Sequence, residues 1–197
     1  MDAASSGTPA SVLVVCTGNV CRSPLVEGLL RRRLAELGVG PDEVVVASAG
    51  VRALAGDPMT PQAERELTTL GGEARGFRSR QLVESMVRGA DLVVTAERAH
   101  RSAVVQLVPR ALRYTFTVRE LHRLMGDADL AQLPDGPAER VRALPQLASA
   151  RKGMVAAAAD DDDIADPYRR SDDDYARTTS QLDPAVRALA AVIAGRR

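Results

Sequence analysis

Short apolar runs alternate with amphipathic stretches along most of this chain. Four of the runs are short enough and rich enough in β-branched residues to be buried β-strands, at residues 11–15, 43–50, 91–96 and 112–118. Helical patterns fill much of the chain between and after them, at about 24–37, 60–71, 79–88, 97–107 and 172–194. Strands that alternate with helices predict an α/β fold, a single domain with a four-stranded parallel sheet and helices on both faces.

Two stretches depart from this alternation. Residues 1–10 are mostly small and polar, and we expect them to form a disordered tail before a domain at 11–197. Residues 126–162 contain proline, alanine and aspartate runs, and we interpret them as a partly flexible insertion that the core does not need. A weak helical pattern within it offers a small apolar stripe, formed by Val141, Leu144 and Leu147.

Composition and charge argue against several classes of protein. The 197 residues include 26 basic and 26 acidic ones, so the formal net charge is zero and no basic field for nucleic acid is expected. No apolar run approaches the roughly 18 residues of a membrane span, and the N-terminal residues lack the basic and apolar regions of a secretory signal. Two cysteines are too few for a disulfide framework. We therefore expect a cytoplasmic protein with no membrane span and no nucleic-acid partner.

Both cysteines lie in one stretch, "VLVVCTGNVCRSPLVEGLL", where the first predicted strand gives way to a helix. Ser23 is a natural N-cap for that helix, and Pro24 suits its first position. The positive end of the helix dipole, the charge of Arg22 and the hydroxyls of Thr17 and Ser23 all favour the thiolate form of Cys16. The thiolate is the nucleophilic form of cysteine, so this loop is a candidate catalytic site.

The same loop has the features of a phosphate-binding site. Successive backbone N–H groups from residue 17 to residue 23 can form an anion nest. Gly18 permits a close approach of the backbone, and Asn19 tolerates the left-handed conformation that such a curl requires. The planar guanidinium of Arg22 can bind two phosphate oxygens at once. Taken alone, however, a cysteine after a valine run is more often a buried core residue than a nucleophile.

The segment "VCTGNVCRSP" resembles the signature C-x5-R-[ST]-P of the low-molecular-weight protein tyrosine phosphatases, and specifically of their bacterial type. Three further segments are similar to that family: "SAG" after the second strand, "SRQL", and "DIADPY" near the C-terminus. The resemblance covers nearly all of residues 11–195 except the insertion. It implies a phosphatase without metal or cofactor that acts on a tyrosine-phosphorylated protein, with a bacterial tyrosine kinase as one candidate partner.

The resemblance also implies roles for individual residues. Cys16 would be the nucleophile that carries phosphate, Arg22 the phosphate clamp, and Asp166 the general acid and base. Cys21 would be the redox partner of Cys16. The residues expected around the phosphate and the substrate are Thr17, Gly18, Asn19, Val20, Cys21, Ser23, Leu54 and Tyr168.

This sequence departs from the family pattern at three places, one of which is Arg169, where some members have a second aromatic residue. Phe77 occupies the position of a histidine that bonds the loop asparagine in the family, which leaves the support of Asn19 open. Leu54 stands where the family often has an aromatic residue. Tyr168 is therefore the ring that we expect beside the substrate.

Two alternatives remain open from the sequence. One is an arsenate reductase of the same fold coupled to a small thiol, because the thioredoxin-coupled type needs cysteines downstream and none follows Cys21. The other is a non-catalytic phosphate-binding module, against which the joint presence of nucleophile, clamp and acid argues. His100 and His122 have no third ligand near them in the sequence, so neither predicts a metal site.

Overall fold

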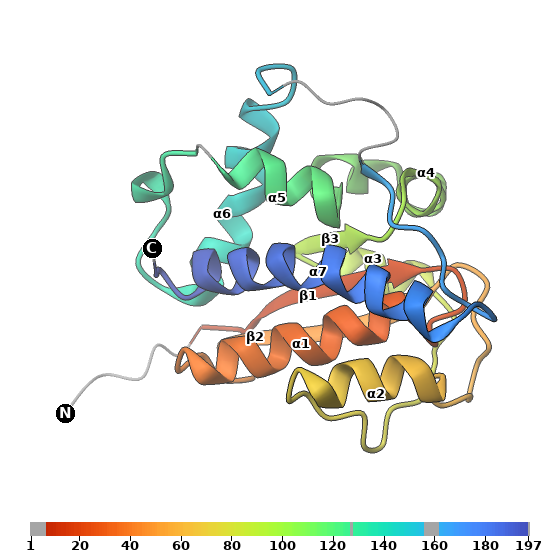
Figure 1. The fold of residues 1–197 in the computed structure, drawn as a ribbon. Helices are drawn as coiled ribbons and strands as arrows, with labels where there is room; N and C mark the ends of the chain where they lie inside the picture. The colour runs from red at the N-terminus through yellow and green to blue at the C-terminus, as the bar shows by residue number, and fades with distance from the viewer. Residues whose placement is uncertain (1–6, 127, 156–161, 197) are drawn as a thin grey trace.

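A computed structural model describes residues 7–126, 128–155 and 162–196 (Figure 1). The first six residues of the predicted tail, and residues 127 and 156–161 of the predicted insertion, lie outside the described residues. One sheet contains four parallel strands in the order β2-β1-β3-β4, with bounds β1 (Ala10–Cys16), β2 (Val44–Gly50), β3 (Leu92–Thr95) and β4 (Thr115–Thr117). The predicted α/β class and parallel sheet are confirmed, and the first strand begins at Ala10, within the segment that we assigned to the tail.

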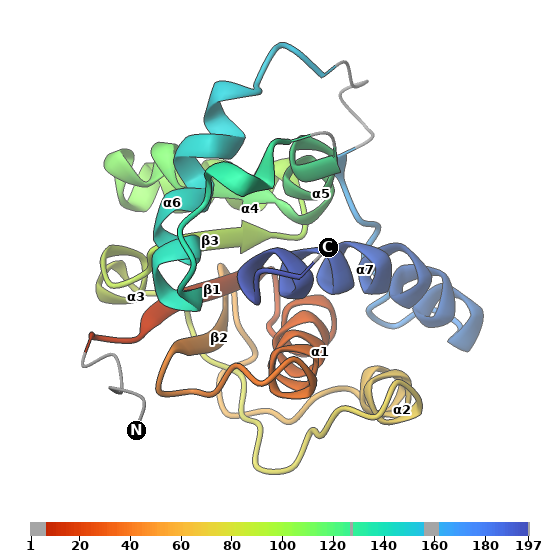
Figure 2. The same ribbon diagram turned by 90° about the vertical axis from the view of Figure 1, so that its left-hand side faces the viewer.

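Helices cover both faces of this sheet. They are α1 (Arg22–Glu36), α2 (Pro61–Thr69), α3 (Glu84–Arg88), α4 (Arg98–Leu107), α5 (Val118–Gly126), α6 (Pro137–Ala150) and α7 (Asp172–Ile193). Figure 2 shows α3 and α4 on one side of the strands and α1 and α7, side by side, on the other. Among the described residues, no helix is both long enough and apolar enough to cross a bilayer.

The central strand β1 shows why its sequence is apolar without interruption. Val12 and Val14 belong to the core beneath α1 and α7, whereas Leu13 and Val15 belong to the second core, beneath α3 and α4. Successive side chains of a strand point to opposite faces, so a strand with a helix layer on each side must be apolar at every position. All four side chains are at most 3% exposed.

The beginning of α1 differs from the prediction. We expected Ser23 to cap a helix from Pro24, but the helix begins at Arg22, its N-cap residue is Cys21, and that residue makes no side-chain cap bond. The hydroxyl of Ser23 bonds Cys16 and Asn19 instead. Ser23, a residue type that often caps helices, thus stabilises the loop that precedes the helix.

The predicted insertion contributes to the core. Its weak helical pattern forms α6, with Pro145 inside the helix. Val141 and Leu144 are completely buried in the same core as α1 and α7, and Leu147 packs partly against it. The apolar stripe therefore lies against the domain as expected. Two of the three stripe residues are fully buried in the core, and whether the fold needs this segment stays a prediction.

Two further boundaries were drawn too generously from the sequence. Of the helix expected at 79–88, only Glu84–Arg88 is helical, and Gln81 forms a bridge to Gly50 at the end of β2. Of the strand expected at 112–118, only Thr115–Thr117 is a strand. A short 3-10 helix over Pro109–Arg113 precedes it, because a proline favours a helical start and offers no N–H to a strand.

Candidate active site

The predicted site lies at the point where the order of the strands in the sheet reverses. From β1, the next strand in sequence lies on one side and the third on the other, so the connections after β1 and β3 diverge. Such a divergence leaves a crevice beyond the carboxyl ends of the strands, where ligands of open α/β sheets bind. Residues 16–23, which we call the Cys16 loop, follow β1 into this crevice, and Glu97 follows β3.

Backbone hydrogen bonds fix the conformation of the Cys16 loop from outside. The carbonyls of Cys16, Thr17 and Gly18 accept from the N–H groups of residues 51, 52 and 54 at 3.0 Å, and the carbonyl of Val20 accepts from residue 60 at 2.9 Å. In a trans peptide the next N–H points away from the carbonyl. The N–H groups of residues 17, 18, 19 and 21 therefore point away from this supporting segment, as an anion nest requires.

The packing of the Cys16 loop requires a glycine at position 50. A Cβ atom built on Gly50 would lie 2.4 Å from the carbonyl oxygen of Thr17 and 3.0 Å from the backbone nitrogen of Asn19. On Gly18 it would meet only Val20 at 3.5 Å and Leu54 at 3.9 Å, which are ordinary contacts. The close approach of the Gly18 backbone to a bound phosphate stays a prediction. Within the protein, the close contact with the loop is made by the glycine of the "SAG" segment.

Asn19 is held without the family's histidine. Its backbone has a φ of 55°, the left-handed conformation that the sequence predicted. Its amide nitrogen donates to Ser23 at 2.9 Å and to Ser48 at 2.8 Å, and its amide oxygen accepts from the backbone nitrogen of Arg80 at 2.7 Å. Ser48 in turn donates to Glu27 at 2.5 Å. A backbone N–H on the segment after Phe77 thus helps to hold this side chain.

This chain of hydrogen bonds ends on the sulfur of Cys16. Because the Asn19 amide nitrogen can only donate, the oxygen of Ser23 accepts from it, and the Ser23 hydroxyl proton is left for Cys16 Sγ at 2.9 Å. Hydrogen bonds to the charged form of a group favour that form. Cys16 also lies before the N-terminal end of α1, where the dipole is positive. A donated hydrogen bond and the positive end of a helix dipole therefore meet at the Cys16 sulfur.

Arg22 joins the Cys16 loop to the residues that were predicted to act with it. Its side chain is 1% exposed, its Nη2 lies 2.8 Å from a carboxylate oxygen of Asp166, and its Nη1 donates to the carbonyl of Ile164 at 2.8 Å. Nη1 also pairs with Glu97. The buried Nε has no hydrogen-bond partner within the described part of the chain. The guanidinium thus meets the acid directly and retains one unpaired donor.

A pocket of about 230 Å³ opens beside these groups. Most of the predicted site residues line it, together with one arginine that the sequence did not single out: Cys16, Thr17, Gly18, Val20, Cys21, Arg22, Arg52, Leu54, Asp166 and Tyr168. The apolar part of the lining comes largely from Val20, Leu54 and the ring of Tyr168. Asn19 and Ser23 stay outside the lining and support the loop from behind.

The second cysteine is buried, as the first is. Cys21 is 4% exposed, and its sulfur lies 3.4 Å from the Tyr175 hydroxyl and 3.5 Å from that of Thr60. Burial raises the pKa of the Cys21 thiol above its usual value and raises that of Tyr175 to about 12. Cys21 is therefore the protonated thiol of the pair at neutral pH, and both cysteines are free.

Ser48, Glu97 and His100 contact the predicted site residues, although none of the three was expected to belong to the site. Ser48 lies in the quoted "SAG" segment, but no role was assigned to it. Glu97 and His100 follow β3, and His100 Nε2 lies 2.8 Å from the Thr17 hydroxyl although the ring is 3% exposed. Burial lowers the pKa of His100 below its usual value. The signal that could have found both residues was their position after the strand next to β1.

Comparison with known proteins identifies the family of this chain. A family model described as low molecular weight phosphotyrosine protein phosphatase matches residues 11–144. The chain belongs to this family. Within the described residues, no group of three or more histidine, cysteine or acidic side chains could hold a metal ion.

Individual relatives within the phosphatase family differ in their named substrates. The protein-tyrosine-phosphatase Etp of Escherichia coli K12 is 39% identical over 99 residues, which are 50% of this chain and 62% of Etp. A protein-arginine-phosphatase of Geobacillus stearothermophilus is 35% identical over 136 residues, 68% of this chain and 86% of that protein. The solved structure of Vibrio vulnificus Wzb with benzylphosphonate has a TM-score of 0.65 at 25% identity, covering 92% of this chain and 97% of Wzb.

Proposed function

We propose that this protein hydrolyses phosphotyrosine in proteins through a covalent phosphocysteine on Cys16. The observation that carries the proposal is the position of Arg22. Its buried guanidinium joins the Cys16 loop to Asp166, so a nucleophile, a phosphate-binding cation and a proton donor line one pocket. A reduced thiolate is best preserved in the cytoplasm, which is the location that we propose.

The reaction follows from these positions in two steps. The Cys16 thiolate attacks phosphorus, an S–P bond forms, and the P–O bond to the tyrosine ring breaks while Asp166 donates its proton to the leaving oxygen. Asp166, now a carboxylate, then takes a proton from water as the water oxygen attacks phosphorus. The S–P bond breaks, and the products are inorganic phosphate and the Cys16 thiolate.

The ion pair between Arg22 and Asp166 has to open when phosphate binds. A phosphate that enters the loop competes with the Asp166 carboxylate for the guanidinium. The Arg22 guanidinium can then turn its Nη2 and its unpaired Nε to two phosphate oxygens. Glu97 remains on Nη1 and orients the guanidinium from behind.

Phosphotyrosine fits the walls of this pocket better than phosphoarginine. The walls beside the loop are apolar, formed largely by Val20, Leu54 and Tyr168, and suit an aromatic ring. Phosphoarginine would place a guanidinium group near Arg52, which lines the pocket, and near Arg169, which lies 5.1 Å from the Tyr168 ring centroid. Two cations at the pocket rim favour an anionic peptide over a cationic one.

A side-by-side assay tests this proposal. Initial rates should be measured with phosphotyrosine, phosphoarginine and phosphoserine peptides, and arsenate reduction should be followed with a small thiol. We expect the phosphotyrosine peptide to be the best substrate. Faster turnover of phosphoarginine would contradict the argument from the pocket walls, and arsenate reduction without phosphatase activity would replace the proposal with a reductase.

A variant of the nucleophile tests the mechanism. Cys16→Ser should abolish essentially all turnover, since the hydroxyl is a far weaker nucleophile, and it should still bind vanadate. Substantial residual turnover in Cys16→Ser would contradict a covalent role for the thiol. Loss of vanadate binding in this variant would show that the loop itself had changed.

A further inference from the structure

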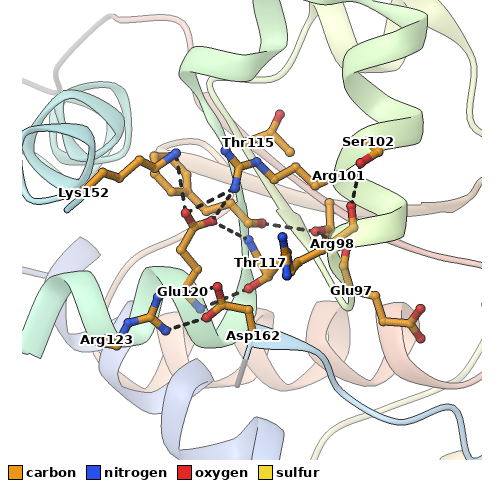
Figure 3. Close-up of polar contacts among 12 residues, drawn as sticks. Glu97, Arg98, Arg101, Ser102, Thr115, Thr117, Glu120, Arg123, Lys152 and Asp162 are labelled. Atoms are coloured by element: carbon orange, nitrogen blue, oxygen red, sulfur yellow. Dashed lines mark hydrogen bonds and ion pairs between the residues drawn. The ribbon is translucent and has the colours of Figure 1, made fainter. Parts of the chain in front are cut away.

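The start of α4 contacts two residues of the Cys16 loop. From the end of β3, Glu97 pairs with the Arg22 guanidinium, and His100 bonds the hydroxyl of Thr17 at 2.8 Å. Figure 3 shows the start of α4, from Glu97 to Ser102, beside the pair of Arg123 with Asp162. The chain that carries the proposed acid therefore passes the same helix start that supports the nucleophile loop.

A residue from this passing segment caps α4. The helix's own N-cap residue, Glu97, makes no side-chain cap bond. Instead, Asp163 accepts a hydrogen bond from the backbone nitrogen of Arg98 at 2.7 Å. The next residue, Ile164, donates its backbone N–H to the carbonyl of Ala96 at 3.0 Å. A carboxylate at this point also complements the positive end of the helix dipole.

This contact lies three residues before Asp166. Ile164 between them is completely buried, and its carbonyl accepts from Arg22 Nη1 at 2.8 Å. Arg22 Nη2 then meets the carboxylate of Asp166 at 2.8 Å. Because so few residues separate the cap from the acid, a shift of the capped segment changes where the acid carboxyl lies. A misplacement of about 1 Å can cost roughly 100-fold in rate.

We propose that Asp163 is a positioning residue for the acid: by capping α4 from outside the helix, it holds Asp166 against Arg22 and the pocket. The inference rests on the proposed phosphatase activity. Asp163 is not itself placed as the acid, because its carboxylate bonds the helix backbone and does not line the pocket, whereas that of Asp166 does. Asn at this position would keep the acceptor without the charge.

The dependence of rate on the leaving group tests the proposal. Phenyl phosphate needs a proton on its leaving oxygen, whereas 2,4-dinitrophenyl phosphate does not. In Asp163→Ala we expect kcat/KM, which reports the transfer of phosphate to Cys16 and not the later hydrolysis, to fall about tenfold with phenyl phosphate and less than about twofold with dinitrophenyl phosphate. Asp163→Asn should stay close to the unmodified enzyme with both substrates. The double variant Asp163→Ala/Asp166→Ala should be no slower than Asp166→Ala alone, because the position of an absent acid has no effect.

Matched controls separate positioning from charge and from stability. Asp173→Ala removes an exposed aspartate from the first turn of α7 and should leave both rates unchanged. Rates should be compared well below the melting temperature of every variant. Should Asp163→Ala not fold, Asp163→Glu keeps the charge, displaces the carboxylate by one methylene and supports the same comparison.

Several results would overturn the inference. They are an equal loss with both substrates, an Asp163→Asn variant as slow as Asp163→Ala, or additive losses in the double variant. A leaving-group dependence in Asp166→Ala but not in Asp163→Ala would contradict the role of Asp163 alone. If the unmodified enzyme hydrolyses neither substrate, or if Asp166→Ala lowers kcat/KM equally for both, the proposed function itself fails.

Discussion

The Cys16 loop and the segment that carries Asp166 are held in different ways. The loop is continuous in sequence, and it is fixed by four outward carbonyls, a satisfied Asn19 and the close packing of Gly50. The acid segment, residues 162–168, comes from a distant part of the chain, and the side chain of Asp166 is 42% exposed. Its fixed points are the buried Ile164 and the cap that Asp163 places on α4.

The difference matches what each region has to do. A phosphate-binding loop must present its N–H groups in one geometry before the substrate arrives, because pre-oriented dipoles stabilise the developing charge without reorganisation. In the proposed reaction, Asp166 releases Arg22, gives up a proton to the leaving oxygen and later takes one from water. We therefore expect the Cys16 loop to be held in one conformation, and Asp166 to be anchored through its neighbours while its own side chain stays exposed.

Oxidation of Cys16 should abolish the activity of the enzyme. Peroxide converts the Cys16 thiolate to a sulfenic acid, and the neighbouring Cys21 thiol can displace water from it to form a disulfide. We expect full loss of activity that dithiothreitol restores, and irreversible loss in Cys21→Ala. Mass spectrometry should find a Cys16–Cys21 disulfide. Only sulfinic or sulfonic Cys16 in the unmodified enzyme would contradict this role of Cys21.

Gly50→Ala should displace the Cys16 loop from the segment that supports it. A Cβ atom there would lie 2.4 Å from the carbonyl oxygen of Thr17, so the loop must move. We expect phosphatase activity to fall roughly 100-fold or more, since loop displacement misplaces both the nucleophile and the amides. Gly126→Ala is the control, because a Cβ there meets nothing within 4 Å. Equal activity of the two variants would show that the loop does not depend on this contact.

Leu144→Ala tests whether the chain leading to the acid segment belongs to the core. Leu144 is completely buried, and its truncation should lower the free energy of unfolding by about 2–5 kcal/mol, measured by urea denaturation. Leu147→Ala, on the half-buried side of the same helix, should cost less. Activity below the melting temperature should change little. An unchanged stability of Leu144→Ala would support the interpretation of this segment as a dispensable insertion.

The smallest effect concerns His100 and pH. Because burial lowers the folded-state pKa of His100 below the ordinary value of 6.5, the unfolded chain binds a proton first as the pH falls below 6.5. The free energy of unfolding should therefore decrease as the pH falls through this range. In His100→Gln, which keeps a polar partner for Thr17, the decrease between about pH 7 and about pH 5 should be shallower. Parallel urea titrations at the two pH values check this, and identical slopes would contradict it.

The sequence predicted the regions whose signal is local. The continuous apolar run of β1, the C-x5-R spacing and the "DIADPY" segment each lie within a few residues, so pattern and resemblance were enough to propose Cys16, Arg22 and Asp166, which line one pocket. The left-handed Asn19 was also expected from its residue type. Where a local rule competed with tertiary contacts, the prediction failed: Ser23 bonds the sulfur of Cys16 and does not cap the helix.

The supporting contacts could not be predicted in the same way. The bond between Thr17 and His100 joins residues 83 positions apart, and that between Arg98 and Asp163 spans 65 positions. No periodicity or motif encodes such pairs. They arise because β1 and β3 are neighbours in the sheet and end at the same edge, and the position of the acid segment at that edge is a property of the whole fold.

The central claim is that phosphate passes through Cys16 while Asp166 serves as acid and base, and one measurement tests it directly. Asp166→Ala should be mixed with 2,4-dinitrophenyl phosphate, whose departure needs no proton, and quenched within the first turnovers. Because the second step lacks its base, the phosphoenzyme should accumulate, and peptide mass spectrometry with ³¹P NMR should place the phosphate on the sulfur of Cys16. A phosphate on any other residue, or turnover of this substrate with no phosphoenzyme, would contradict the account.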